Sequence, residues 1–171
     1  MKTAQNKTLQ KRLALSKSKG FTLIELLVVI GILAVLLAIT LIAINPQRQF
    51  SQANNTKRSS DINAILNAIG QYAADNKGAL PTNLATTCDS AAPCSITSDT
   101  AVTSRADICS DLVPQYLAAL PVDPLTSGGT PVTDCAVTYT TNYEVYRGTD
   151  NRITVTAPAT ELGIAILTVT R

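Results

Sequence analysis

The sequence predicts an α+β fold, in which a long N-terminal helix packs through its second half on a small C-terminal antiparallel sheet. Three observations support this prediction. Residues 21–44 are an almost unbroken apolar run, residues 47–77 repeat apolar side chains every three or four positions, and residues 137–170 contain alternating segments rich in Val, Thr and Tyr. Together they place a long helical region before at least three strands, an order typical of a helix that covers one face of a sheet.

The first 20 residues form a basic leader. They contain six Lys and Arg residues and no acidic residue, whereas the whole chain has 14 basic residues, 12 acidic residues and no histidine. Without the leader the chain has 8 basic and 12 acidic residues, so its formal charge changes from +2 to −4. We therefore expect residues 1–20 to have no stable fold, and we assign the basic character of the chain to the leader rather than to a nucleic-acid-binding head.

Residues 21–44 are long and apolar enough to form a membrane-spanning helix. Glu25 is the one charged residue among them, and their helical length of about 36 Å exceeds the ~30 Å hydrocarbon core of a bilayer. Lys and Arg before the helix favour a cytoplasmic N-terminus, so residues 45–171 are expected on the outer side of the membrane. A plain membrane anchor is the alternative interpretation of the same run.

Residues 45–78 are predicted to continue the helix as an amphipathic segment. A bend or local break is expected just before Pro46, because proline lacks a backbone donor and clashes with the preceding turn. Residues 54–56 (Asn-Asn-Thr) are a predicted weak point, and residues 76–78 (Asn-Lys-Gly) resemble a C-terminal cap. The apolar stripe that should face the sheet comprises Ile62, Ile65, Leu66, Ile69, Tyr72 and Ala73.

Residues 79–171 are predicted to form a globular head. Residues 79–106 are rich in Ser and Thr and are expected to be a long loop without a core of its own, and residues 107–119 are expected to form a short helix. A rigid turn at residues 120–124 leads to three candidate strands at residues 137–146, 152–157 and 164–170. A hairpin turn is expected at residues 148–151.

Four cysteines, Cys88, Cys94, Cys109 and Cys135, lie in the part of the chain predicted to be outside. An even number in an oxidising compartment predicts two disulfides, and the sequence alone allows three pairings. Cys88–Cys94 with Cys109–Cys135 is favoured, because the first bond closes a short loop that contains a proline. Free buried thiols are the alternative, and a zinc site is disfavoured because the spacing does not fit and the chain has no histidine.

The segment from Gly20 to Glu25 (Gly-Phe-Thr-Leu-Ile-Glu) closely resembles the processing and methylation site of type IV pilins and type II secretion pseudopilins. The resemblance is strong over residues 17–44 and looser elsewhere, although the order of leader, long helix, loop and sheet matches the pilin layout. It implies that a prepilin peptidase cleaves between Gly20 and Phe21, and that the new amine of Phe21 is methylated. It also implies a helix held in the cytoplasmic membrane and then assembled, through an inner-membrane assembly platform, with copies of itself into a helical filament.

The resemblance places Glu25 at the centre of assembly. A lone carboxylate within an apolar run is costly in lipid, and in the family it pairs with the N-terminal amine of a neighbouring subunit. Leaving one partner of a buried ion pair unpaired costs on the order of 3–5 kcal/mol, so this pairing would favour the filament. The alternative is that Glu25 lies near the headgroups and stabilises its own helix N-terminus. For Gly20, the alternative to a cleavage site is a simple helix breaker.

Calcium is a weaker expectation, which comes from the resemblance to pseudopilins that hold this ion in a turn region. The candidate ligands are Asp123, Asp134 and Asp150, since calcium prefers carboxylate and carbonyl oxygens. The sequence contains no EF-hand loop, and solubilising surface acids are the interpretation that it favours for these residues. No other cofactor is expected.

The expected function is that of a structural filament subunit used in adhesion, motility or DNA uptake, with an extracellular location after assembly. A major pseudopilin of a type II secretion system, in a periplasmic pseudopilus, is an alternative. Residues 116–124 (Tyr-Leu, then Leu-Pro and Asp-Pro) resemble the corresponding region of major pseudopilins and some pilins. A membrane-anchored extracellular binding protein or enzyme is the alternative of another class. An enzyme is disfavoured because the chain has no histidine, no P-loop and no dinucleotide-binding glycine pattern.

Direct nucleic-acid binding is also disfavoured. It would require Arg147, Arg152 and Arg171 to cluster on the sheet, whereas the charge of the chain without its leader is negative and aromatic residues are few.

Overall fold

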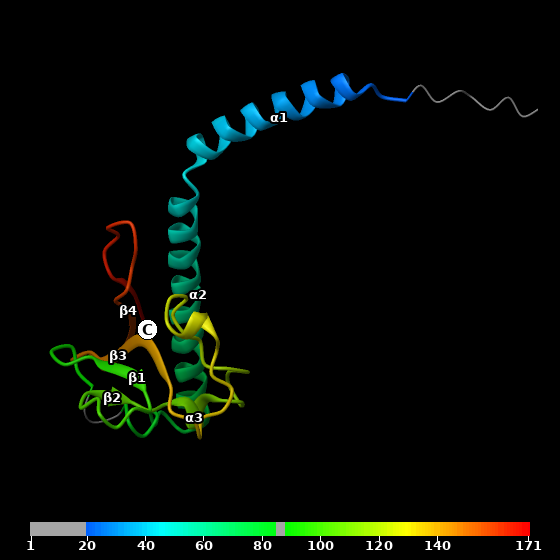
Figure 1. Cartoon of the computed structure of the whole chain (residues 1–171). Coiled ribbons are helices and arrows are strands. Elements are labelled where there is room, and N and C mark those ends of the chain that lie inside the picture. The colour runs from blue at the N-terminus through cyan, green and yellow to red at the C-terminus, as the bar shows by residue number, and fades with distance from the viewer. Residues whose placement is uncertain (1–19, 85–87) are drawn as a thin grey trace, which may run out of the picture. The chain divides into compact units, whose positions relative to one another are not determined.

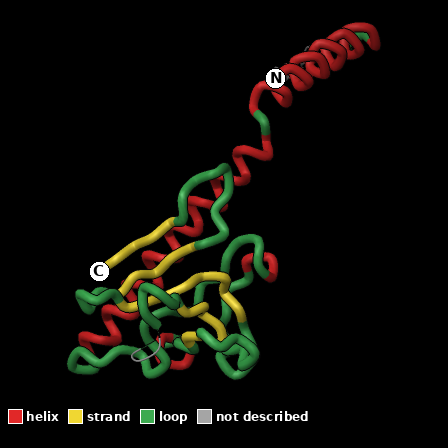
Figure 2. Tube along the Cα trace, turned by 90° about the vertical axis from the view of Figure 1, so that its left-hand side faces the viewer, coloured by secondary structure: helices red, strands yellow, loops and turns green. Residues whose placement is uncertain are grey.

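The structure, a computed structural model of the whole chain, describes residues 20–84 and 88–171. The predicted leader therefore lies outside the described residues, except for Gly20. The chain divides into two units, one that ends at Ile44 and one that spans Asn45–Arg171. Figure 1 shows the helix of the first unit and the helix and sheet of the second, and Figure 2 shows the same elements coloured by type.

Helix α1 (Leu23–Ile44) is the one regular element among the described residues of the first unit. None of its 22 residues is buried, and apolar side chains surround it on every side, as expected of a helix that lies in lipid or within a bundle. Its 22 residues extend about 33 Å at 1.5 Å per residue. This helix is long and apolar enough to cross a membrane, as predicted.

Helix α2 (Pro46–Asp75) begins one residue after α1 ends. Asn45 has a left-handed backbone (φ 45°), and its side-chain oxygen accepts a hydrogen bond from Arg48 N at 3.4 Å, which caps the new helix. Pro46 occupies the first helical position, where a missing N–H leaves no hydrogen bond unmade. The break predicted just before Pro46 is therefore confirmed.

The prediction of a weak point at residues 54–56 is wrong, because α2 continues through these residues to Asp75. Asn55 is buried, and its side chain bonds to the backbone of Glu161 and to the side chain of Arg58 instead of competing for the helix backbone. At the other end, Asn76 N donates to Tyr72 O at 2.9 Å, and Lys77 and Gly78 have φ values of 57° and 90°. The predicted cap at residues 76–78 is thus confirmed.

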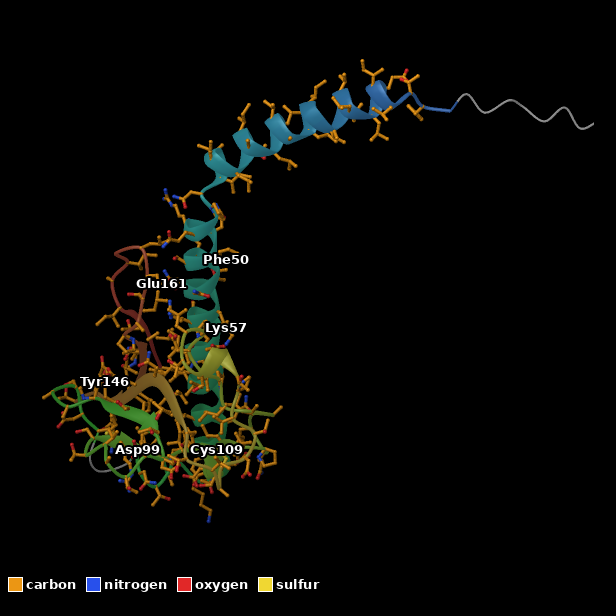
Figure 3. The ribbon with its side chains drawn as sticks, in the orientation of Figure 1. Phe50, Lys57, Asp99, Cys109, Tyr146 and Glu161 are labelled. Atoms are coloured by element: carbon orange, nitrogen blue, oxygen red, sulfur yellow. A yellow bond between two sulfur atoms is a disulfide. The ribbon has the colours of Figure 1, made fainter. Side chains whose placement is uncertain are left out.

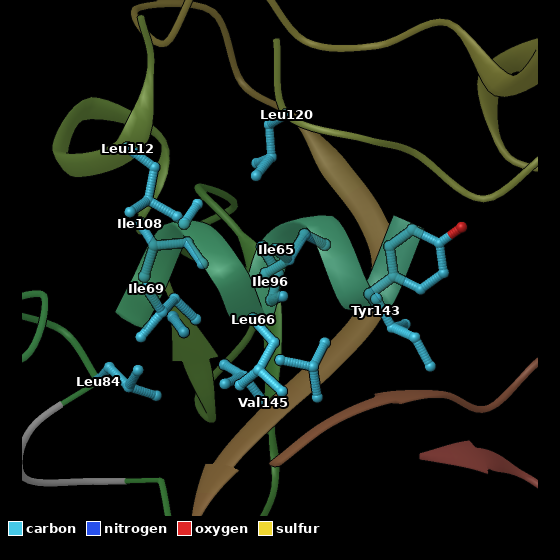
Figure 4. Packing of buried hydrophobic residues seen from close by; sticks show 14 of the residues in the cluster. Ile65, Leu66, Ile69, Leu84, Ile96, Ile108, Leu112, Leu120, Tyr143 and Val145 are labelled. Carbon is cyan, nitrogen blue, oxygen red and sulfur yellow. The ribbon is translucent and has the colours of Figure 1, made fainter. Parts of the chain in front are cut away.

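The apolar stripe of α2 forms the core of the second unit, as predicted. Ile62, Ile65, Leu66 and Ile69 are at most 3% exposed. Figure 4 shows this face of α2 against side chains of the sheet and of the loops that precede it. The same buried face continues toward the N-terminus of α2 with polar residues, which are Ser51, Asn55 and Arg58.

The sheet has five strands in the order β2-β1-β3-β4-β5. They are β1 (Cys94–Thr97), β2 (Arg105–Ala106), β3 (Thr140–Arg147), β4 (Ile153–Ala157) and β5 (Leu167–Thr170). Pairs β1–β3, β3–β4 and β4–β5 are antiparallel, with Val145, Val155 and Val169 in one row across the sheet. The β1–β2 pair is parallel, so the sheet is mixed rather than fully antiparallel as predicted.

Strands β1 and β2 lie in the stretch that was predicted to be a loop without a core. That prediction is wrong, because Cys94 and Ile96 of β1 are fully buried against α2 and β3. The four-residue strand contains only two apolar side chains, and Ser, Thr and Asp dominate its surroundings. Alternation over so short a length does not stand out from a polar loop.

The remaining elements match the prediction in kind and differ in extent. Helix α3 (Cys109–Leu112) is shorter than the helix predicted at residues 107–119. Val113, the C-cap residue of α3, is joined to Pro114 by a cis peptide bond. The predicted hairpin turn joins β3 to β4, where Gly148 N donates to Arg152 O at 2.8 Å. A short 3₁₀ turn at Ser127–Gly129 lies in the loop before β3.

Two disulfides connect the loops of the second unit to its core. Cys88 is bonded to Cys94, and Cys109 is bonded to Cys135, which is the pairing that the sequence favoured. The first bond attaches the loop before β1 to that strand. The second attaches α3 to the long loop before β3. None of the four cysteines has a free thiol.

Candidate functional site

Gly20 and Phe21 lie at the start of the described chain, ahead of α1. Gly20 is exposed, and a Cβ atom built on it would have no heavy atom within 4 Å. Phe21 is 87% exposed. The peptide bond between them is therefore not covered by any described part of the chain, which an enzyme that cleaves the backbone requires.

Glu25 forms a capping box with Thr22 at the N-terminus of α1. The backbone N and the Oγ1 of Thr22 both donate to Oε2 of Glu25, at 2.8 and 2.7 Å. In return, Glu25 N donates to Thr22 Oγ1 at 3.3 Å. This reciprocal arrangement satisfies two N–H groups that the first turn of a helix leaves without partners.

The capping box uses only one oxygen of the carboxylate. Both donors of Thr22 converge on Oε2, and Oε1 of Glu25 has no hydrogen-bond partner among residues 20–84 and 88–171. Sequence reasoning singled out Glu25 but missed Thr22. The signal was present, because a Thr followed three residues later by Glu before an apolar run is the pattern of a capping box.

The rest of α1 offers an apolar surface with one hollow. A shallow depression of the helix surface lies at Gly31, between the side chains of Leu27, Val28, Ile32, Val35 and Leu36. Small residues allow close approach of helix backbones in a membrane. Thr40 is the other polar residue within α1. Its hydroxyl donates to Leu37 O at 2.9 Å, so it needs no hydrogen-bond acceptor from another helix.

A second polar centre lies inside the second unit, around Arg58 of α2. The side chains of Arg58 and Asp123 are both 0% exposed. Arg58 Nε is 2.6 Å from Asp123 Oδ2, and Nη2 is 3.2 Å from Oδ1, so the pair is bidentate. The Nη1 atom contacts Glu161 Oε2 at 3.0 Å and Asn55 Oδ1 at 2.9 Å.

Glu161 belongs to the loop between β4 and β5, and α2 holds it from three further positions. Ser51 Oγ donates to Oε1 at 3.0 Å, and Asn54 Nδ2 donates to Oε2 at 2.8 Å. Asn55 bonds to both the backbone N and the backbone O of Glu161, at 3.1 and 3.0 Å. Figure 3 shows Glu161 beside the part of α2 between Phe50 and Lys57.

These contacts shift the pKa values of the charged groups in a consistent direction. The hydrogen bond from Asn54, and then those from Arg58 and Ser51, lower the pKa of Glu161. The hydrogen bond to Asp123 raises the pKa of Arg58. The centre therefore remains an ion pair at neutral pH. Sequence reasoning missed it, although the spacing of residues 51, 55 and 58 continues the buried stripe and so required partners for these polar side chains.

The three calcium candidates do not come together. Asp123 is bonded to Arg58, Asp134 Oδ1 accepts from Ala136 N at 2.9 Å, and Asp150 Oδ1 accepts from Arg152 N at 3.1 Å. Among the described residues, no group of three or more His, Cys, Asp or Glu side chains is placed to hold a metal ion. Asp123 in particular contributes a structural charge to the core.

The arginines weighed for nucleic-acid binding do gather at one end of the sheet. Arg147 is paired with Ile153, and Ile153 exchanges both backbone hydrogen bonds with Arg171, so these three residues form a row. Arg152 precedes Ile153 in the same hairpin. Their guanidinium contacts within the described chain are Arg147 to Asn151 at 2.7 Å and Arg171 to Asn67 at 2.6 Å.

The first 41 residues contain a recognisable family signature. The family model described as the prokaryotic N-terminal methylation motif matches residues 15–41, which include Gly20, Phe21, Thr22 and Glu25. No curated protein and no solved structure matches the chain. The motif is the signature of precursors of type IV pilins and pseudopilins, and the chain carries it in front of an α+β head of pilin-like arrangement.

Proteins with this signature are structural subunits that a prepilin peptidase processes and that assemble with copies of themselves. Helix α1, most of which lies within the matched residues, fits membrane anchoring before assembly. The motif therefore supports a protein of the type IV pilin or pseudopilin class.

Proposed function

We propose that the mature chain is the structural subunit of a type IV pilus-like extracellular filament that serves adhesion, motility or DNA uptake. The precursor is cleaved after Gly20, the new amine of Phe21 is methylated, and the mature subunit assembles through α1. Before assembly α1 anchors the subunit in the cytoplasmic membrane, and the assembly platform in that membrane extracts it.

The observation that carries the proposal is that only one of the two carboxylate oxygens of Glu25 is hydrogen-bonded within the described chain. Its Oε2 atom is occupied by Thr22, while Oε1 has no partner among the described residues. Cleavage after Gly20 would create a charged amine four residues before this acid. In a bundle of copies, the amine of one subunit supplies a donor for the free oxygen of another, in surroundings from which lipid and water are excluded.

The uncovered surface of α1 supports the same proposal. Its apolar side chains have no partner within the described chain, so they require either lipid or other copies of α1. The hollow at Gly31 lets a side chain of a second helix approach closely. Contacts between different faces of identical subunits do not close on themselves, and they therefore build an open helical filament.

The test separates processing from assembly. Glu25→Ala should leave cleavage intact, seen as a mature chain that has lost residues 1–20 and gained one methyl group by mass spectrometry, while surface filaments are lost. Thr40→Ala is the matched control, because it removes a polar group from α1 that bonds only within its own helix. Normal filaments from Glu25→Ala would refute the proposed pairing of Glu25 with the N-terminal amine of another subunit. Gly20→Val should retain the leader, and normal processing of that variant would refute the cleavage position.

A pseudopilin of a type II secretion system is the second candidate. Residues 116–124, which include the Asp123 of the buried pair with Arg58, resemble the corresponding region of major pseudopilins and of some pilins, so they are compatible with both candidates. Electron micrographs of cells labelled with antibodies to residues 79–171 distinguish the two candidates. Long labelled surface filaments support the pilus, whereas loss of protein secretion without such filaments on deletion of the chain supports the pseudopilus.

A further inference from the structure

The loop between β4 and β5 exposes large apolar side chains. Leu162, Ile164 and Ile166, which together are called the apolar tip here, are 47, 45 and 57% exposed. Glu161 is the one charged residue between Ala157 and Thr170. Exposed apolar clusters of this kind in otherwise polar proteins mark contact surfaces.

The loop is held in a fixed conformation. Glu161 is bound by Ser51, Asn54 and Arg58 through its carboxylate and by Asn55 through its backbone. Within the loop, Thr160 Oγ1 donates to Ile164 O at 2.8 Å.

Leu162 has a left-handed backbone (φ 63°) and precedes Gly163, which has a φ of 66°. A leucine in this region is strained, because its Cβ meets a carbonyl oxygen. Strained positions of this kind persist where the surrounding structure imposes them, and they concentrate at functional contacts. The fold therefore imposes a strained turn that keeps the apolar tip in solvent.

The position of the loop along the chain indicates what covers the tip. Glu161 is attached to Ser51, which lies seven residues after Ile44, the last residue of the candidate membrane span. Figures 1 and 2 show the β4–β5 connection beside the N-terminal part of α2. Phe50, next to Ser51, is 71% exposed. The apolar residues of this end of the head thus lie along the N-terminal half of α2, with Phe50 six residues after Ile44 and Ile164 beside Gln52, Asn55, Thr56 and Ser59.

The charges around the tip also fit a lipid surface. Of the three basic residues between Asn45 and Ser60, Arg58 is buried in its ion pair with Asp123 and Lys57 is paired with Asp61, which leaves Arg48. Arg48 is exposed and has no carboxylate partner among the described residues, while the carboxylate of Glu161 is bonded to Ser51, Asn54 and Arg58. Apolar side chains beside an unpaired cation are typical of segments that lie at the boundary between headgroups and acyl chains, where anionic lipids attract the cation.

We propose that the apolar tip, together with Phe50, contacts the outer surface of the lipid bilayer while α1 anchors the subunit, before assembly. The contact holds the head against the membrane. This inference depends on the membrane-anchored stage of the proposed function, but not on the pairing of Glu25 or on the kind of filament.

The chain has no tryptophan, so a single introduced tryptophan reports its own surroundings. The full chain carrying Ile164→Trp is reconstituted at a low protein-to-lipid ratio in vesicles of phosphatidylethanolamine and phosphatidylglycerol, with and without brominated acyl chains. Leu125→Trp is the matched control, because Leu125 is 65% exposed and lies in the loop before β3. Val35→Trp, in the middle of α1, reports insertion of the span. Intact disulfides by mass spectrometry and an unchanged far-UV spectrum confirm folding of each variant.

The expected result is a blue-shifted emission for Ile164→Trp and a several-fold larger loss of fluorescence in brominated lipid than for Leu125→Trp. Equal and weak quenching of these two variants, with Val35→Trp strongly quenched, would overturn the inference and leave the membrane-anchored stage intact. A blue shift at residue 164 that grows with protein concentration and does not respond to bromine would also overturn it, in favour of a contact between two copies. Absence of quenching for Val35→Trp would refute the anchored stage itself.

Discussion

Replacing Arg58 by methionine should destabilise the head strongly while leaving the length and apolar stem of the side chain largely in place. The change removes both bonds to Asp123, at 2.6 and 3.2 Å, and leaves this carboxylate fully buried. Leu125 N, at 2.9 Å, is then its remaining donor. Breaking a buried pair in this way costs about 3–5 kcal/mol, which is a large part of the 5–15 kcal/mol by which a domain is typically stable.

Lys57→Met is the matched control. Lys57 is the neighbouring cation, its side chain is 42% exposed, and its Nζ lies 2.8 Å from Asp61 Oδ2. An exposed pair of this kind contributes about 0.2–1 kcal/mol. The two variants remove the same charge from the same helix, so their difference reports the whole buried network of Arg58, which includes its bonds to Glu161 and Asn55. Arg58→Met combined with Asp123→Asn should recover part of the loss, because asparagine carries no charge and its oxygen still accepts from Leu125 N.

The measurement is the free energy of unfolding from urea titrations of the processed chain in detergent, followed by the near-UV signal of the buried tyrosines. A loss for Arg58→Met no larger than for Lys57→Met would refute the assignment of this centre as a buried ion pair. A double variant as unstable as Arg58→Met alone would show that lost packing, rather than an uncompensated charge, causes the effect.

Three further predictions concern the same unit. Contacts with Asn54 and Arg58 lower the pKa of Glu161. The contribution of this group to stability is therefore present above the ordinary carboxyl pKa of about 4.3 and is lost as the pH falls through the lowered value. Thermal unfolding measured over an acid titration should show this loss in the natural chain and not in Glu161→Gln. Tyr143→Phe removes a hydrogen bond to Asp61 Oδ2 at 2.8 Å and should cost about 1.5–3 kcal/mol in urea titration, whereas Tyr146→Phe should cost almost nothing. Replacing both cysteines of the Cys109–Cys135 bond by alanine opens a loop of sequence separation 26 and should lower the free energy of unfolding by about 3–4 kcal/mol. The same change at Cys88–Cys94, with a separation of 6, should lower it by about 2 kcal/mol. Equal losses of stability in calorimetry would contradict the loop-length argument.

Local patterns in the sequence were sufficient to predict α1, the apolar stripe of α2 and the hairpin between β3 and β4. Each depends on residues close together in the chain, such as the three- and four-residue spacing from Ile62 to Ile69 or the glycine at position 148. The parallel pairing of β1 with β2 depends on contacts that no short pattern encodes. A four-residue strand with two apolar side chains has too little periodicity to be recognised.

The buried centre at Arg58 illustrates the same limit from another side. The spacing of residues 51, 55 and 58 places them on the buried face of α2, so the sequence could have predicted that these polar side chains need partners. It could not have identified Asp123 and Glu161, which lie 65 and 103 residues away in the chain. Only the packing of the turn at residues 120–124 and of the β4–β5 loop against α2 brings these acids to the arginine.

The two glutamates that interrupt apolar surroundings differ in how completely they are satisfied. Both oxygens of Glu161 are bonded, Oε1 to Ser51 and Oε2 to Asn54 and Arg58, and this carboxylate fastens the β4–β5 loop to α2 within one chain. Glu25 has one bonded oxygen and one free oxygen on a helix with no covering neighbour among the described residues. Because Thr22 already satisfies half of the carboxylate, an unsatisfied acid cannot by itself supply the whole drive for assembly. In the proposed filament, we therefore infer that the apolar surface of α1 supplies the larger part of the drive and that the remaining oxygen of Glu25 selects the register in which a second copy packs.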